Sequence, residues 1–161
     1  MKLLVIGADG LIGASLCRAA RARSWTVRGT SRRAVAPGFE RLDLADDTVA
    51  PVLQDAHDVV ILCAALSRHD QCAAAPQTGR LVNVESPVRI AQQVQGRGAH
   101  VIFLSTDSVF GEHNAHRGES DPVSPEGRVY PMLKAQAEAR LQAVVPAERL
   151  TIVRLTKVVS V

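Results

Sequence analysis

The sequence contains few aromatic residues, few cysteines and no long apolar run. Its 161 residues include one Trp, one Tyr, three Phe and three Cys, although 47% are hydrophobic. A membrane-spanning helix needs about 20 consecutive apolar residues, and no run in this chain approaches that length. No charged-then-apolar leader precedes the first strand-like segment. The sequence therefore predicts a soluble, cytoplasmic protein with an aliphatic core and no membrane partner.

Charge and cysteine spacing exclude two further classes of site. The net charge is +3, but the basic residues are scattered and lack the interleaved aromatics that stack on bases, so nucleic acid is not an expected partner. Cys17, Cys63 and Cys72 lack metal-ligand spacing and fall in apolar or helical stretches, which predicts buried free thiols. His113 and His116 have no suitable third ligand nearby, so we expect solvated histidines and no metal site.

Short apolar runs alternate with longer segments of helical period. This alternation is typical of a parallel sheet with crossover helices, and the length suits one domain. We therefore predict one α/β domain over residues 1–161, a Rossmann-type doubly wound parallel sheet of about six strands with helices on both faces. The expected strands are Lys2–Ile6, Thr26–Thr30, Phe39–Leu42, Val59–Cys63, His100–Ser105 and Leu150–Arg154. The expected helices are Leu11–Arg23, Asp47–Gln54, Thr78–Gln95 and Tyr130–Val144, and Glu112–Arg128 is one long loop, of a kind that often binds ligand.

The stretch GADGLIG, residues 7–13, lies at the first strand-to-helix junction. There Gly7 permits a tight turn, Gly10 lets the backbone approach a pyrophosphate, and Gly13 lets the helix pack closely on the strand. The free amides at the positive end of the helix would then face the phosphates. The spacing differs from the commoner Gly-x-Gly-x-x-Gly, and a turn that only needs small residues is the alternative. We predict dinucleotide binding.

The residues after the second expected strand indicate which dinucleotide is bound. They read Ser31-Arg32-Arg33 and include no carboxylate. An acidic residue there would accept a hydrogen bond from the ribose 2′-hydroxyl of NAD, whereas arginine suits the 2′-phosphate of NADP because its planar fork donates in pairs. A solvated charged turn is the alternative. NADP(H) is therefore favoured, and NAD(H) stays possible.

Six motifs come in the order of a known family. They are Gly7-x-x-Gly10-x-x-Gly13, Asp43-Leu44 after a strand, CAAL at 63–66, Val82-Asn83, LSTDSVFG at 104–111 and Tyr130-x-x-x-Lys134. Together they resemble the extended short-chain dehydrogenases/reductases over nearly the whole chain. STDSVFG and RLTKVV are similar to the dTDP-4-dehydrorhamnose reductase or sugar-nucleotide reductase branch, although Ser108 stands where that branch usually has tyrosine. The resemblance implies cofactor contacts at Gly7, Asp9, Gly10, Leu11, Ile12, Gly13, Ser31, Arg32, Asp43, Leu44, Ala64, Ala65, Leu66 and Asn83.

Tyr130 and Lys134 are the candidates for proton transfer. A phenol has a pKa near 10, so a tyrosine that exchanges protons near neutral pH needs a neighbour that stabilises the phenolate. Lys134 lies on the same helix face, and we expect its charge to lower the Tyr130 pKa. The resemblance implies that Lys134 also holds the nicotinamide ribose and that Thr106 bonds the substrate carbonyl oxygen. The predicted catalytic residues are therefore Thr106, Tyr130 and Lys134, and Asp107 shapes the strand end or touches substrate.

The resemblance leaves the function open between two classes. In the extended family a C-terminal substrate-binding region follows the strand equivalent to Leu150–Arg154, and we expect this region to be absent from this chain. One possibility is an NADP(H)-dependent reductase, epimerase or dehydratase of a small-molecule substrate such as a nucleotide-sugar, since all three activities share the tyrosine and lysine. The other is a catalytically silent NADP-binding or cofactor-sensing module. Family members often pair through helices like 78–95 and 130–144, so a homodimer is possible.

Overall fold

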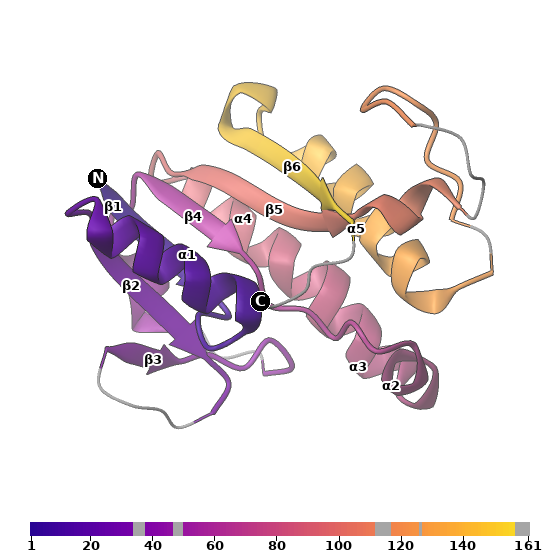
Figure 1. Cartoon of the computed structure of the whole chain (residues 1–161), viewed down its shortest axis with the longest axis horizontal. Coiled ribbons are helices and arrows are strands. Elements are labelled where there is room, and N and C mark those ends of the chain that lie inside the picture. Colours follow the sequence, from indigo (N-terminus) through magenta and orange to yellow (C-terminus); the bar gives the residue numbers. More distant parts are fainter. Residues whose placement is uncertain (34–37, 47–49, 112–116, 126, 157–161) are drawn as a thin grey trace.

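Six strands form one sheet in which every neighbouring pair is parallel. The computed structural model describes residues 1–33, 38–46, 50–111, 117–125 and 127–156. The strands are β1 (Lys2–Ile6), β2 (Thr26–Ser31), β3 (Phe39–Arg41), β4 (Val59–Leu62), β5 (His100–Thr106) and β6 (Leu150–Leu155), in the order β3-β2-β1-β4-β5-β6 (Figure 1). This order confirms the predicted Rossmann-type α/β fold, and it reverses direction between β1 and β4, where such folds bind ligands.

Helices cover both faces of the sheet. In front of the sheet in Figure 1 lies α1 (Leu11–Ala22), whose buried Cys17 and Ala20 pack with Leu3 and Val5 of β1. Behind it lie α4 (Ser86–Gln95) and α5 (Val129–Val144), which pack on the alternate strand residues. That larger core contains Leu4, Ile6, Val60, Leu62, Val101 and Phe103 from the strands and Val88, Ile90, Ala91, Val94, Ala137 and Leu141 from the helices. The strands are therefore apolar on both sides, as expected of a buried parallel sheet.

The segment before α4 differs from the predicted single helix Thr78–Gln95. It comprises α2 (His69–Ala74), α3 (Pro76–Arg80) and a π-helical turn, η2 (Leu81–Glu85), which leads directly into α4. Pro76 in the first turn of α3 separates that helix from α2, because proline cannot donate a helical hydrogen bond. The π turn contains Asn83, and such turns inside helices are frequent at functional sites.

The other short elements are 3-10 turns. The predicted helix Asp47–Gln54 is seen only as the 3-10 turn η1 (Pro51–Gln54), since residues 47–49 lie outside the described part of the chain. Two more 3-10 turns, η3 (Asp107–Phe110) and η4 (Ala147–Arg149), follow β5 and precede β6. Most of the expected loop 112–128 is irregular where it is described.

Cys17 and Cys72 are buried free thiols as predicted, whereas Cys63, at the end of β4, is only half-buried. His113 and His116 lie outside the described residues. Within the described ranges, no three His, Cys, Asp or Glu side chains gather as metal ligands would. The same part of the chain contains no helix that is long and apolar enough to cross a bilayer.

Candidate functional site

The glycine turn lies between the carboxyl ends of β2 and β4. Gly7 has a φ of 86°, and the amides of Gly7 and Ala8 donate to the Thr30 carbonyl at 3.2 and 2.8 Å. A Cβ at Gly7 would lie 2.8 Å from the Ala64 Cβ, and a Cβ at Gly13 would lie only 2.2 Å from the Gly7 carbonyl oxygen. Both positions therefore exclude every larger residue, and the chain can approach α1 this closely only with glycine.

The start of α1 presents unpaired amides to an open surface. Gly10 is the N-cap and supplies no side-chain bond, and the first turn contains no acidic residue. The first amides of a helix have no acceptor within it and carry its partial positive charge. Gly10 is exposed, Leu11 is 52% exposed and Ile12 is half-buried. A Cβ at Gly10 would meet only the Gly7 carbonyl oxygen, at 3.4 Å, so this side of the turn is free for an anion such as a pyrophosphate.

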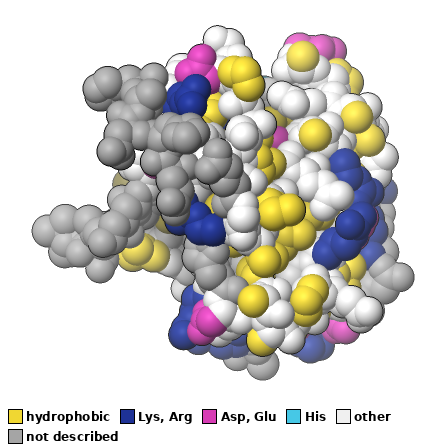
Figure 2. Space-filling model, turned by 90° about the vertical axis from the view of Figure 1, so that its right-hand side faces the viewer, with side chains coloured by type: hydrophobic (Ala, Val, Ile, Leu, Met, Phe, Trp, Pro, Cys, Tyr) yellow, Lys and Arg dark blue, Asp and Glu magenta, His cyan; other side chains and the backbone are white. Residues whose placement is uncertain are grey.

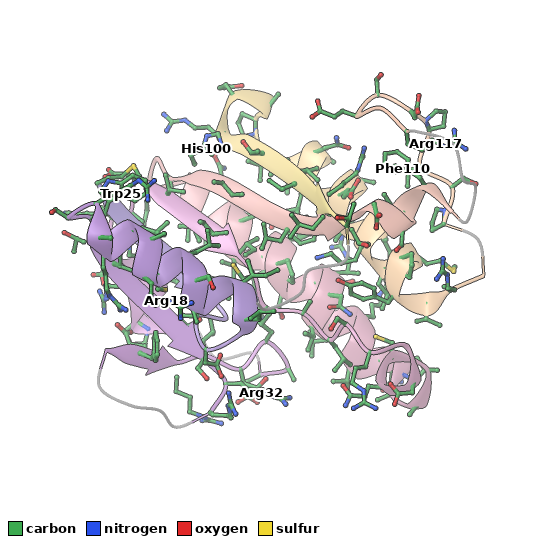
Figure 3. The ribbon with its side chains drawn as sticks, in the orientation of Figure 1. Arg18, Trp25, Arg32, His100, Phe110 and Arg117 are labelled. Atoms are coloured by element: carbon green, nitrogen blue, oxygen red, sulfur yellow. The ribbon has the colours of Figure 1, made fainter. Side chains whose placement is uncertain are left out.

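The end of β2 carries the three residues that the sequence assigned to the adenosine end of the cofactor. Ser31 is buried, at 1% exposure, and its hydroxyl accepts from the Arg33 amide at 3.1 Å. Arg32 is exposed and has no ion-pair partner among the described residues. Figure 3 shows it beyond the arrowhead of β2, at the end of the sheet where α1 begins. Arg32 is thus the free guanidinium here, while Ser31 supports the turn.

A carboxylate that the sequence analysis did not place here also lies at the end of β2. Asp9, from the glycine turn, accepts from Arg33 Nη2 at 2.7 Å and from Arg33 Nε at 3.1 Å. Burial raises the pKa of the Asp9 carboxyl, but hydrogen bonds with Arg33 and Ser31 outweigh this and hold the pKa below its usual value. The two residues are 24 positions apart in the chain, so local sequence gave no signal of the pair.

Two of the other predicted cofactor residues support the backbone. The Asp43 carboxylate accepts from the Ala45 amide at 3.0 Å. Leu44 is 6% exposed, and its carbonyl oxygen accepts from the Ser86 hydroxyl at 2.6 Å. Leu44 therefore belongs to the core behind the site, whereas Asp43 stays half-buried at its edge.

Asn83 fixes the loop that follows β4. Its Oδ1 accepts from the Leu66 amide at 2.9 Å, and its Nδ2 donates to the Leu66 carbonyl at 3.0 Å. The buried amide side chain thus pairs with both backbone groups of Leu66, as a neighbouring strand would do. Ala64 and Leu66 are half-buried and Ala65 is exposed, and the Ala64 amide donates to the Ile6 carbonyl at 2.9 Å. This loop therefore lies directly beside the glycine turn, and Asn83 positions it.

The three predicted catalytic residues come from β5 and α5, which pack together. Thr106 ends β5, and its hydroxyl oxygen accepts from the Ser108 amide at 3.2 Å as the cap of η3. Tyr130 is half-buried in the first turn of α5. Lys134 is 2% exposed, and its ammonium nitrogen lies 3.7 Å from the centroid of the Phe103 ring on β5. The lysine side chain therefore packs against β5, the strand that ends with Thr106.

The expected lowering of the Tyr130 pKa by Lys134 is not found. Burial, and then the nearby Cys72, raise the Tyr130 pKa above its usual value. Burial also lowers the Lys134 pKa to about 7, although Glu138 and Cys63 act in the opposite direction. The physical reason is that the Lys134 ammonium is buried, where a charge is costly, even though the face of the Phe103 ring attracts a cation. Tyr130 is consequently a phenol that keeps its proton at neutral pH.

A buried ion pair behind these residues was missed by the sequence analysis. Glu138, 3% exposed, accepts from the Ser105 hydroxyl and from Arg154, whose Nη2 lies 2.8 Å from Oε2. Arg154 also donates to the Glu119 carbonyl at 2.9 Å and lies over the Phe110 ring. Tyr130, Lys134 and Glu138 repeat at a spacing of four, which places all three on one helix face and could have indicated the pair.

An open hollow of about 890 Å³ lies beside β6. Its walls are formed by the turn η3, the loop that follows it, α5 and β6. The residues that line it include Asp107, Phe110, Arg117, Ile152 and Arg154. Figure 3 shows Phe110 and Arg117 on this side of the molecule. Asp107, expected to shape the strand end or to touch substrate, therefore lies at the rim of a space that a small molecule could enter.

Comparison with known sequences identifies a family that matches nearly the whole chain and individual relatives that match about three quarters of it. Residues 1–160 match the family described as the RmlD substrate binding domain. Methionine adenosyltransferase 2 subunit beta of Xenopus laevis is 35% identical over 124 residues, which are 75% of this chain and 37% of that protein. A probable low-salt glycan biosynthesis reductase of Haloferax volcanii is 33% identical over 132 residues, or 78% of this chain and 44% of that one. The chain thus spans less than half the length of these relatives.

Solved structures have the same fold. A dTDP-4-dehydrorhamnose reductase from Clostridium acetobutylicum superposes with a TM-score of 0.80 at 27% identity, over 96% of this chain and 52% of that one. The dTDP-4-dehydrorhamnose reductase of Bacillus anthracis, solved in complex with NADP, superposes with a TM-score of 0.81 at 21% identity. The match covers 96% of this chain and 53% of that one. The resemblance to the dTDP-4-dehydrorhamnose reductase branch is confirmed, and this chain belongs to the RmlD substrate binding domain family.

Proposed function

We propose that the chain is the NAD(P)(H)-binding part of an oxidoreductase or epimerase that acts on a nucleotide-sugar. The observation that carries the proposal is the glycine turn, where a φ of 86° at Gly7 and the open side of Gly10 leave the amides of α1 accessible. Relatives support the choice of ligand, since one neighbour is described in complex with UDP-glucose and NAD and another with NADP. The turn, the free helix end and the loop at residues 64–66 fit such a dinucleotide.

The chemistry of the site would follow from which groups contact the cofactor and from the protonation of Tyr130. The amides of α1 would hold the pyrophosphate, Arg32 the 2′-phosphate, and residues 64–66 would lie along the nicotinamide half. The bound cofactor supplies or takes up the hydride. Tyr130 keeps its proton at neutral pH, as any phenol with a pKa near 10 does, and would donate it to a carbonyl oxygen, although burial raises its pKa and makes it a weaker acid. Thr106 would hold the same oxygen by a hydrogen bond.

A second candidate is a subunit that binds the cofactor without turnover. Several relatives are methionine adenosyltransferase 2 subunit beta proteins, which are named as subunits. Burial lowers the Lys134 pKa to about 7, so near neutral pH only part of the population carries the charge that would stabilise a tyrosinate. These two observations favour a binding role over catalysis, and turnover distinguishes the candidates.

Cofactor titration tests the binding step. We expect NADPH to bind more tightly than NADH, and Arg32→Ala to lose about 1.5 to 3 kcal/mol of NADPH binding with little effect on NADH, because one bidentate phosphate contact is removed. Intrinsic fluorescence of the reduced cofactors reports both affinities. Equal affinities that do not change in the variant would contradict the NADP(H) preference, and no binding of either cofactor would contradict the proposed function.

Turnover tests the catalytic step, in this chain and in any longer natural form. With a panel of nucleotide-linked 4-keto sugars and NADPH, Tyr130→Phe should keep cofactor affinity but lose about 10²- to 10⁴-fold in rate, because only the proton donor is removed. Lys134→Ala should damage both binding and turnover. Full activity of Tyr130→Phe would contradict the role of the tyrosine. Cofactor binding without turnover in every form would support the subunit instead.

Pairing of two copies through 78–95 and 130–144 is also proposed. The side of the molecule that carries α2, α3 and the start of α5 bears hydrophobic side chains beside Lys and Arg side chains (Figure 2). At the start of α5, Val129 and Met132 are 36% and 51% exposed. Burial of such side chains would stabilise a dimer, which analytical ultracentrifugation of the protein and of Met132→Glu would detect or contradict.

A further inference from the structure

The Asp9–Arg33 pair joins the two segments that contact opposite ends of the adenosine diphosphate in this fold. Asp9 belongs to the glycine turn, where the pyrophosphate binds, and Arg33 follows β2, where the ribose 2′ position is recognised. Both Arg33 nitrogens in the pair, Nε and Nη2, bond the same oxygen, Oδ2, at 3.1 and 2.7 Å. Asp9 is 21% and Arg33 is 70% exposed at the side chain, so the pair borders solvent.

The pair changes the charge that a ligand meets at this edge. Asp9 precedes the N-cap Gly10, yet its carboxylate bonds Arg33, and no side chain caps α1. The amides of α1 are therefore left open. At the same time the carboxylate neutralises Arg33, so that of the two arginines directly after β2 only Arg32 has no ion-pair partner among the described residues. The sequence, with two adjacent arginines and no acid, indicated a stronger phosphate site than the structure contains.

We propose that Asp9 determines cofactor selectivity by restraining the 2′-phosphate site: it pairs with Arg33 and withholds that positive charge from the phosphate, which weakens NADP(H) relative to NAD(H). This inference rests on the proposed function. The Asp9 carboxylate is charged throughout the neutral range, because the hydrogen bonds with Arg33 and Ser31 more than offset burial in their effect on the Asp9 pKa. The effect falls on NADP(H) alone, because only that cofactor carries charge at the 2′ position.

Asp9→Asn tests the proposal, because the amide has the same shape but no charge. We expect NADPH affinity to rise about three- to tenfold, as is typical of freeing one opposite charge at a partly exposed site, and NADH affinity to change less than about twofold. The rise should shrink at high ionic strength. In Asp9→Asn/Arg33→Ala the rise should disappear, because the arginine that was released is gone. Asp55→Asn changes the net charge equally at a residue that precedes the amino end of β4 and pairs with Arg28, and it should leave both affinities unchanged.

The outcomes separate this inference from the proposed function. If the parent protein binds neither cofactor, the proposed function fails and the inference fails with it. If the parent binds but Asp9→Asn strengthens NADPH and NADH equally, Asp9 acts on the pyrophosphate, and the selectivity role is wrong. A rise that survives loss of Arg33, or one that Asp55→Asn reproduces, also overturns the proposal. A fall in NADH affinity with unchanged NADPH would show that Asp9 instead bonds the 2′-hydroxyl.

Discussion

At the residue scale, Gly10 and Gly13 differ in what a side chain would meet. A Cβ at Gly13 would lie 2.2 Å from the Gly7 carbonyl oxygen, whereas one at Gly10 would lie 3.4 Å from the same atom. The first distance requires the backbone to shift, and the second is an ordinary contact. Gly13 is therefore needed for the fold, whereas Gly10 matters for the ligand only under the proposed function.

We predict that Gly10→Ala keeps its stability but loses cofactor binding, because the methyl group occupies the side of the turn that a pyrophosphate would approach. Gly13→Ala should lose about 2 kcal/mol or more of unfolding free energy, because an overpacked contact forces strain. Urea unfolding and NADPH titration of both variants give the two readouts. Gly118→Ala is the control, since a Cβ there meets nothing within 4 Å. Normal NADPH affinity in Gly10→Ala would contradict this assignment.

Local sequence predicted the turn at Gly7 and the close packing at Gly13 well, and it predicted the charged contacts poorly. Gly7 and Gly13 owe their roles to neighbours within the same turn, so the spacing alone was sufficient. The partner of Asp9 lies 24 residues away, and the orientation of Lys134 depends on Phe103 in another element. Such contacts depend on the packing of β2 on β1 and of α5 on β5, which no local pattern specifies.

At the scale of elements, Glu138 joins α5 to β5 and β6. Its carboxylate accepts from Ser105 on β5 and from Arg154 on β6, and Arg154 in turn bonds the Glu119 carbonyl. Both charged groups are largely withdrawn from water, with side-chain exposures of 3% and 18%. The pair therefore fixes the helix that carries Tyr130 and Lys134 against the strands and the following loop.

Glu138→Gln should destabilise the protein by about 3 kcal/mol, because it leaves the largely covered Arg154 without a counter-charge. Glu85 gives a matched control, since it also pairs with two arginines, Arg80 and Arg140, but is 34% exposed. Glu85→Gln should cost less than about 1 kcal/mol. Urea unfolding measures both changes, and equal losses in the two variants would show that burial of the Glu138 pair is unimportant.

The strands were predicted more closely than the helices. Continuous apolar runs predict β1, β4 and β5 without any knowledge of the helices that pack on them. Each of these strands lies within one residue of its expected bounds. The stretch 69–95 has no comparably simple pattern, because Pro76 interrupts it and the π turn at Asn83 serves a contact with Leu66. A tertiary hydrogen bond therefore determined the local helix type there.

At the scale of the whole molecule, the buried Lys134 makes stability depend on pH. Burial lowers its pKa to about 7 from the usual 10.5, so between these values the unfolded chain binds a proton that the folded chain does not. Stability therefore rises with pH in this window and is lost as the pH falls toward 7. Cys63 acts oppositely only above about pH 9, where its thiol ionises in the unfolded chain, since burial raises its folded pKa to about 12.

We accordingly predict that the unfolding free energy increases from pH 7 to pH 8.5, with a slope of up to about 1.4 kcal/mol per pH unit. Lys134→Met removes the titrating group while keeping the apolar stem over Phe103, so its stability should be nearly constant over the same range. Urea unfolding at four pH values for both proteins measures the slopes. A parent slope equal to that of Lys134→Met would mean that the folded protein keeps Lys134 charged, and Lys134 would then be able to stabilise a tyrosinate after all.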